Sequence, residues 1–409
     1  MLKLIHSADL HLGDPAGVFG SGAKKHRRMV NESLDKIVQT AIAQKAQLVL
    51  LAGDIFDNIK PDEQLVEKFR AAAEKLAAAQ IHLVACPGNH DRLEDGSVWG
   101  KFQVAQLLQK FIIVARPVAI PADGQDLVHI YLSELQTNVF TRIVATQKSS
   151  QDMTTGMKEF INQVLEAQKA AGQSVTHNIA MLHGSIAREG QRANFPITKV
   201  GLEALFTTGI EYVALGDWHG YLDAGAELGL PASKVLYPGS PEFLDTAQAN
   251  SGSLLQVELQ GGGQTKVSRI KLSELELIKL NLNLNQMNWQ TALKQLQAQA
   301  EGAGERKIVR VELTGEVSLA DLVDIEQNLS AEALQDSLGE SFYFLASDSK
   351  INAAVTDADL AGHPEGSIPH EFIQAVTGMV TRSEIDQELA QKVLATGMAA
   401  ILDKLRKHS

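Results

Sequence analysis

The segment Leu48–Asp57, LVLLAGDIFD, constrains the fold of this chain more than any other. Its run of apolar residues, ending at a glycine, predicts a strand that is buried on both faces. Gly53 allows the backbone to turn sharply where this strand ends. Asp54 then lies at the carboxyl end of a central strand, where open α/β sheets bind their ligands. Its carboxylate either bridges metal ions or caps the following helix, and the rest of the chain decides between these interpretations.

Other apolar runs of the chain end in the same way, with aspartate, asparagine or histidine close behind the run. The residues at these further ends are Asp9, His11, Asn89, His90, His183, Asp217 and His219. If the strands belong to one sheet, all these side chains converge on one edge. Carboxylate, imidazole and amide ligands suit Mn²⁺, Fe²⁺ or Zn²⁺, and the set lacks the thiolates of a structural zinc site. The pattern therefore favours a metal centre over unrelated caps and core histidines.

The spacing of Asp9 and His11 carries a further expectation. Residues i and i+2 of an extended segment point to the same side. We therefore expect Asp9 and His11 to bind one ion together.

The length of the chain and its changes in pattern predict more than one domain. A chain of 409 residues is expected to form two or three domains. Strands and helices alternate over residues 1–115, which predicts right-handed crossovers and a largely parallel inner sheet. The composition changes near Ser273, and residues 280–350 have the pattern of a small α+β unit. A linker follows at 352–368, and residues 383–408 form an amphipathic helix by pattern.

Composition excludes several classes of protein. No apolar run approaches the ~18 residues of a membrane span, so we expect no contact with a membrane. The first residues lack the pattern of a secretory signal. A single cysteine, Cys86, excludes an internal disulfide and fits a reducing, cytoplasmic location. The net charge of −12 argues against broad, non-specific nucleic-acid binding but leaves room for a local basic patch.

The strand-end motifs resemble the signature of the calcineurin-like metallophosphoesterase family, and within it the SbcD-type nuclease subunits of DNA repair. The matching segments are DLH at 9–11, GDIFD at 53–57, GNHD at 88–91, HG at 183–184, GDWH at 216–219 and LYPGSPEF at 236–243. The resemblance is strong over about residues 1–270 and weak afterwards. It implies an α/β (α+β) fold, namely a four-layer β-sandwich flanked by helices, with a smaller α+β cap domain and C-terminal helices. The expected boundaries are 1–272 for the nuclease domain, 273–350 for the cap, and 351–409 for the linker and C-terminal helices.

The resemblance also implies two divalent metal ions, with Mn²⁺ as the first choice and Fe or Zn as alternatives. By position, Asp9, His11 and His219 would hold one ion, Asn89, His183 and Asp217 the other, and Asp54 would bridge both. Asp217 stands where the family usually has histidine, which adds a negative charge to the second site. Asp57 and Asp91 would orient ligands or their loops. His90 would face the substrate, where it stabilises the phosphoryl group or protonates the leaving oxygen.

Basic residues near the expected metal edge are candidates for contacts with DNA phosphates. They are Lys24, Lys25, Arg27 and Arg28 after DLHLG, and Arg188 and Arg192 after HGS. A solvated face is the alternative interpretation for both groups.

The sequence is compatible with three functions. The first is a DNA phosphodiesterase, an exonuclease or endonuclease that acts with an SbcC-type SMC-like ATPase and can form a homodimer. The second is a small-molecule phosphoesterase for cyclic nucleotides or phosphomonoesters. The third is a non-enzymatic subunit with a residual metal site. The residues beyond 273 exceed what a small-molecule enzyme needs, and every ligand position holds a competent side chain, so we favour the first function.

Overall fold

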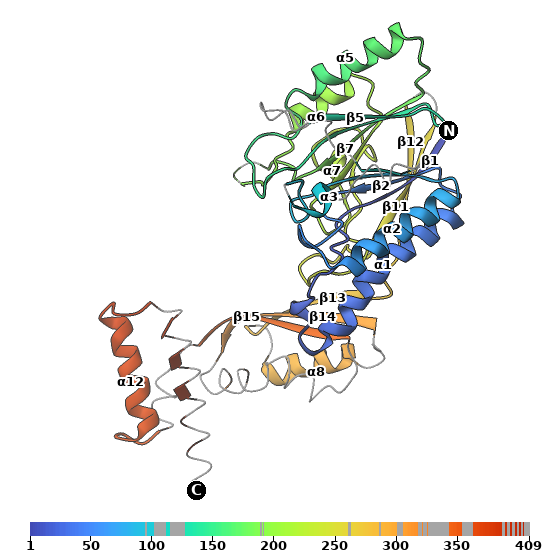
Figure 1. Ribbon diagram of the computed structural model, residues 1–409. Coiled ribbons are helices and arrows are strands. Elements are labelled where there is room, and N and C mark those ends of the chain that lie inside the picture. Colours follow the sequence, from blue (N-terminus) through green and yellow to red (C-terminus); the bar gives the residue numbers. More distant parts are fainter. Residues whose placement is uncertain are drawn as a thin grey trace. The chain divides into compact units, whose positions relative to one another are not determined.

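The computed structural model divides the chain into two compact units, Met1–Glu274 and Leu275–Ser409 (Figure 1). It describes residues 1–94, 96–101, 112–114, 127–188, 190, 192–260, 263–285, 288–300, 306–317, 343–353 and 363–386, and single positions between 321 and 404. The finer boundaries expected for a cap and for C-terminal helices stay predictions.

The first sheet is built around parallel strands. In the described residues its order is β12-β11-β1-β2-β3-β4. Its strands are β1 (Leu2–Ser7), β2 (Leu48–Ala52), β3 (His82–Cys86), β4 (Ile112–Val114), β11 (Ser253–Gln260) and β12 (Gln264–Lys271). Strands β1 to β4 run parallel, whereas β11 and β12 form an antiparallel hairpin beside β1. Every residue of β2 and of β3 is buried, as the apolar run of β2 predicts.

The second sheet carries the remaining ligand-bearing strands. Its order in the described residues is β5-β6-β7-β8-β10-β9. The strands are β5 (Leu127–Leu132), β6 (Thr137–Arg142), β7 (His177–His183), β8 (Tyr212–Gly216), β9 (Leu222–Asp223) and β10 (Val235–Tyr237). β6, β7, β8 and β10 are parallel, and β5 and β9 are antiparallel edges. His183 pairs with Gly216, so β7 and β8 end at the same level.

Helices cover the outer faces of the two sheets. The longer ones are α1 (Ala23–Ala43), α2 (Glu63–Ala78), α5 (Met157–Ala170) and α6 (Lys199–Phe206), and the short ones are η1 (Gly17–Gly22), α3 (Val98–Lys101) and α7 (Ala224–Glu227). α1 and α2 lie side by side (Figure 1) and pack Leu34 and Phe69 into a core that also holds Met181 and Ala214 of the second sheet. α5 and α6 contribute to a second core on the other face of that sheet. Mixed sheets between helices confirm the predicted α/β fold.

A buried histidine joins the two sheets. His6 of β1 places Nε2 3.1 Å from the Leu215 carbonyl oxygen and Nδ1 2.8 Å from the Tyr212 hydroxyl, both on β8. A carbonyl only accepts, so Nε2 carries the proton, and the Tyr212 hydroxyl donates to Nδ1. Burial lowers the pKa of His6 to about 3, against the opposing effect of the Leu215 carbonyl, and the ring is therefore neutral.

The second unit contains a parallel sheet of order β13-β14-β15 in its described part. Its elements are β13 (Glu276–Asn283), α8 (Trp289–Ala300), β14 (Lys307–Val317), β15 (Phe344–Ala353) and α12 (Ile368–Thr381). Much of the predicted 383–408 helix lies outside the described residues. Its described positions Leu394 and Met398 pack against Ile373 of α12, whereas Leu389 is 48% exposed. None of the helices in the described ranges has the length and hydrophobicity needed to span a bilayer.

Candidate metal centre

The carboxyl ends of strands from both sheets meet at one place. Asp9, His11, Asp54 and Asn89 follow strands of the first sheet, whereas His183, Asp217 and His219 end or follow strands of the second. The two edges are joined directly, because the Asp217 amide donates to Asp9 at 2.9 Å and His183 Nδ1 lies 2.9 Å from the Ala52 carbonyl oxygen. The candidate ligands therefore do converge on one place, but they come from the edges of two sheets rather than one.

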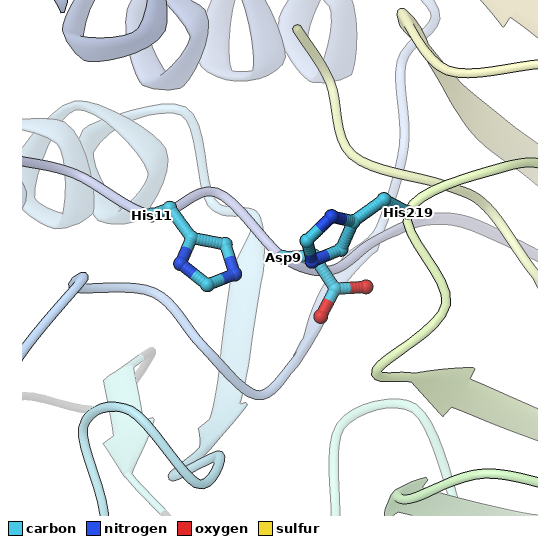
Figure 2. A group of neighbouring side chains, drawn as sticks. All are labelled: Asp9, His11 and His219. Carbon is cyan, nitrogen blue, oxygen red and sulfur yellow. The ribbon is translucent and has the colours of Figure 1, made fainter. Parts of the chain in front are cut away.

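One group of potential ligands consists of Asp9, His11 and His219. Figure 2 shows the three side chains beside one another, and their ligand atoms all lie within 4.8 Å of each other. His11 Nδ1 is 3.0 Å from Asp57 Oδ1, which fixes the ring. His11 Nε2 is buried and has no hydrogen-bond partner in the described part of the chain. A buried nitrogen without a partner is costly unless it binds something, so this atom fits a metal ligand.

A second group gathers around His183. Its Nδ1 donates to the Ala52 carbonyl oxygen, so a neutral ring carries a lone pair on Nε2. That nitrogen faces two acceptors, Asn89 Oδ1 at 3.1 Å and Asp54 Oδ2 at 3.3 Å. The contact is favourable only when a cation or a proton lies there. Accordingly, although burial opposes the charged form, Asp54 and Asp9 raise the pKa of His183 well above its ordinary value.

Asp54 lies between the two groups. Its Oδ2 is 3.6 Å from His11 Nε2 and 3.3 Å from His183 Nε2, and its side chain is buried. The same carboxylate accepts the His90 amide at 2.8 Å through Oδ1. This is the position that a bridging carboxylate requires, and the bridging role stays a prediction.

Asp217 is oriented differently from the other candidates. One oxygen lies 3.9 Å from His183 Nε2, and the other accepts a short hydrogen bond from the Ser185 hydroxyl. Among the described residues, Asp217 belongs to none of the groups whose ligand atoms all lie within 4.8 Å of one another, so its role as a ligand stays a prediction. Ser185 was not among the residues predicted from the sequence. Its position two residues after His183 is the only signal that pointed to it.

Four of the candidate ligands have a backbone conformation that is unusual for residues other than glycine. Asp9, His11, Asp54 and Asp217 have φ angles of 54°, 45°, 48° and 104°. Such left-handed conformations cost non-glycine residues roughly 1–2 kcal/mol each. The expectation that Asp9 and His11 lie in an extended segment is therefore wrong. Their amides are held by the Gly53 and Asp54 carbonyl oxygens, at 3.1 and 3.0 Å, and this pairing turns the loop.

Two glycines allow the ligand loops to approach. A Cβ atom on Gly53, where φ is 87°, would lie 2.2 Å from His183 Nδ1. A Cβ atom on Gly88 would lie 2.1 Å from Asp54 Oδ1. Since neither position has room for a larger residue, the glycines of GDIFD and GNHD are required for the packing of the centre.

His90 is the most open of the histidines at this site. Its side chain is 45% exposed, and its ring centroid lies 4.6 Å from that of His11. Nδ1 is held by Asp57, at 3.1 Å from the main-chain oxygen and 3.5 Å from Oδ1. The contact with the Asp57 side chain raises the pKa of His90 to about 9, against the effect of burial.

Asp57 and Asp91 form contacts that fix other residues of the site in place. Asp57 contacts the Nδ1 atoms of both His11 and His90. Asp91 is buried and accepts hydrogen bonds from the amides of Gly88, Ile55 and Phe56 at 2.7, 2.9 and 3.1 Å. Burial raises the pKa of Asp91 to about 6. These contacts are what an orienting role requires.

A loop residue outside the recognised motifs also reaches the site. Asp245 Oδ2 lies 3.6 Å from His219 Nδ1. No pattern in the sequence indicates this contact, because Asp245 follows LYPGSPEF in a segment without strand or helix periodicity.

The candidate DNA-binding residues have different surroundings. Lys24, Lys25, Arg27 and Arg28 are exposed in the first turns of α1, where Arg28 pairs with Glu32. Arg192 is exposed as well. Arg188 instead forms a two-pronged contact with Glu227, at 2.6 and 3.2 Å, and lies 5.1 Å above the ring of Trp218. Contact with DNA stays a prediction for all six.

Similarity to known proteins agrees with this geometry. Residues 2–221 match the model of the family described as calcineurin-like phosphoesterase. The uncharacterized metallophosphoesterase YhaO of Bacillus subtilis is 25% identical over 246 residues, 59% of this chain and 53% of that protein. The DNA double-strand break repair protein Mre11 of Aeropyrum pernix is 35% identical over 95 residues, 22% of this chain and 21% of that protein. A subunit of nuclease SbcCD from Staphylococcus saprophyticus is 20% identical over 288 residues, 68% of this chain and 72% of that protein.

The chain thus spans about half the length of YhaO and about a fifth of the length of Mre11. The family model, however, covers more than half of the 409 residues and includes the whole run of motifs from Asp9 to His219. Calcineurin-like phosphoesterases use a dinuclear site for divalent metals, and the aspartates and histidines gathered at this edge supply suitable ligands for one. The chain belongs to the calcineurin-like phosphoesterase family.

Proposed function

We propose that this chain is a metal-dependent phosphoesterase that hydrolyses phosphodiester bonds of DNA, as an exonuclease or endonuclease. The observation that carries the proposal is the similarity to the nuclease SbcCD protein, whose 288 aligned residues outnumber those of the family model. The shorter similarity to a DNA repair protein supports the same substrate. We further propose an SbcC-type ATPase as the partner, since the aligned relative is one component of an SbcCD nuclease.

In this proposal Asp9, His11 and His219 hold one divalent cation and Asn89, His183 and Asp217 hold the other, with Asp54 shared. Oxygen and imidazole ligands suit Mn²⁺, which we propose as the native metal, with Fe and Zn as alternatives. When bound, such a metal pair supplies an activated water and neutralises the charge that develops on a phosphoryl group.

The protein groups around the centre have separate tasks. Asp57 holds His90 through Nδ1, so Nε2 is the nitrogen that can reach a phosphoryl oxygen. His90 is partly exposed and adjacent to Asn89, and it is suited to stabilise the phosphoryl group or donate a proton to the leaving oxygen. The exposed lysines and arginines that open α1 are suited to bind phosphates farther along the strand.

A substrate panel tests the proposal. The purified protein is supplied with Mn²⁺ and offered linear DNA, hairpin DNA, bis(p-nitrophenyl) phosphate and cyclic nucleotides. Asp54→Asn serves as the inactive variant. Asp35→Asn is the matched control, because Asp35 pairs with Lys68 at 2.8 Å between the two helices α1 and α2.

We expect the wild-type protein and Asp35→Asn to cleave DNA and the bis-aryl ester, and Asp54→Asn to cleave neither. Hydrolysis of cyclic nucleotides without DNA cleavage would instead identify a small-molecule phosphoesterase. If the wild-type protein cleaved none of these substrates, the nuclease proposal would be wrong.

A further inference from the structure

The imidazole rings of this site share one feature. Each has its Nδ1 beside an oxygen of the protein. The pairs are His183 with the Ala52 carbonyl at 2.9 Å, His11 with Asp57 Oδ1 at 3.0 Å, His90 with the Asp57 carbonyl at 3.1 Å, and His219 with Asp245 Oδ2 at 3.6 Å. Such contacts decide which nitrogen keeps its proton and which is left for a metal.

The oxygen beside His219 Nδ1 comes from a different part of the chain than the oxygens beside the other three rings. Ala52 and Asp57 belong to β2 and the GDIFD motif, whereas Asp245 lies in the loop between β10 and β11. The same loop also fixes the main chain of His219. The His219 carbonyl oxygen accepts the Ser240 amide at 2.8 Å and the Ser251 hydroxyl at 2.7 Å. One loop therefore holds both the backbone and the ring of this residue.

Asp245 is itself held in place. Its Oδ1 accepts the Ala247 amide at 2.6 Å, which leaves Oδ2 directed at the His219 ring. The end of the loop is attached to the hairpin, because Arg269 of β12 donates to the Ser253 hydroxyl at 2.8 Å and lies 3.3 Å from the Ser251 carbonyl oxygen. The carboxylate is thus a fixed group beside His219, with its side chain 36% exposed.

We propose that Asp245 is a positioning residue for His219. Its negative charge keeps the proton on Nδ1 and leaves the Nε2 lone pair for the metal that Asp9 and His11 share. The inference rests on the metal centre of the proposed function and adds a residue from outside the family motifs. A ligand held in this way binds its metal more tightly, and loss of such a contact typically weakens binding about 10- to 100-fold.

Two variants separate this role from a structural one. Asp245→Ala removes both oxygens. Asp245→Asn keeps an oxygen for the Ala247 amide, but it places a neutral amide where the charge lay. The matched control is Asp223→Asn, because Asp223 likewise fixes a turn, accepting the amides of Ala226 and Ser233 at 2.9 and 2.8 Å.

The main measurement is metal binding rather than turnover. Metal-free protein is titrated with Mn²⁺, and bound metal is measured at equilibrium for each variant. We expect both Asp245 variants to bind one of the two ions about 10- to 100-fold more weakly and the other unchanged, while Asp223→Asn matches the wild-type protein. The melting temperature of metal-free Asp245→Asn should match that of the metal-free wild-type protein. If Asp245 had a structural role instead, the melting temperature of the variant would be lower.

Hydrolysis of bis(p-nitrophenyl) phosphate gives a second readout. Because Asp245 acts through His219 in this proposal, excess Mn²⁺ should restore the kcat of both variants. The inference is overturned if Asp245→Asn binds both ions as the wild-type protein does, whether or not Asp245→Ala does. If the wild-type protein bound no Mn²⁺, the proposed metal centre itself would be wrong. That outcome differs from one in which only the role of Asp245 is wrong.

Discussion

Acidification should weaken the contact between the two sheets through His6. Its pKa is about 3 in the folded state and 6.5 in an unconstrained chain. The folded protein holds the ring neutral, so this stabilisation is complete above about pH 6.5 and is lost as the pH falls toward 3. Each unit of pH in that window costs about 1.4 kcal/mol. Lowering the pH from 7 to 5 should therefore remove about 2 kcal/mol from the free energy of unfolding of the unit Met1–Glu274.

Urea unfolding at pH 7, 6 and 5 measures this loss. Chelator is present throughout, so that metal binding does not contribute. A Trp289→Phe background leaves Trp99 and Trp218 as reporters, and both belong to the first unit.

The comparison is with His6→Gln, which does not titrate. Other buried histidines, such as His26, whose pKa burial also lowers, are present in both proteins and cancel in the difference. We expect the wild-type protein to lose about 2 kcal/mol more than His6→Gln between pH 7 and pH 5. Equal losses in the two proteins would refute the conclusion that His6 is neutral in the fold.

Further predictions concern the metal centre. Asp54→Asn should retain less than about a tenth of phosphodiester hydrolysis, since a neutral amide cannot offset the charge of two cations; higher retained activity would rule out a bridging role. His90→Ala should lose turnover but keep its metal, and elemental analysis showing a metal-free variant would contradict its placement outside the ligand set. Asp217→His should fold, change the metal preference and keep hydrolysis within about tenfold; an inert variant without metal would mean that Asp217 is not a ligand. Gly88→Ala should lower metal content, because its Cβ would lie 2.1 Å from Asp54 Oδ1, and unchanged content would show that the loop can adjust.

The strands that carry the centre could be predicted from the sequence because each contains a mainly apolar run, with a glycine or a candidate ligand at its end or within a few residues of it. β2 illustrates this, since Leu48–Ala52 is buried throughout and Gly53 has the positive φ that its turn requires. Periodicity also identified α1, whose buried residues include Val30, Leu34 and Ile37 at helical spacing. These features depend on local sequence and on burial alone.

Other features depend on contacts between distant segments and could not be predicted in this way. The left-handed backbone at Asp9 and His11 arises from main-chain hydrogen bonds to the GDIFD loop, which no pattern within residues 9–11 records. The division of the ligands between two sheets follows from strand pairing. Ser185 and Asp245 reach Asp217 and His219 only after the chain has folded.

The left-handed residues also affect how this protein would respond to engineering. At Asp9, His11, Asp54 and Asp217, a glycine would relieve the conformational cost while deleting the side chain. Any selection scheme that scores melting temperature alone would thus favour changes at the positions that the centre needs most. Libraries built to raise the stability of this protein should therefore keep these four codons fixed, and should measure bound metal as well as heat resistance.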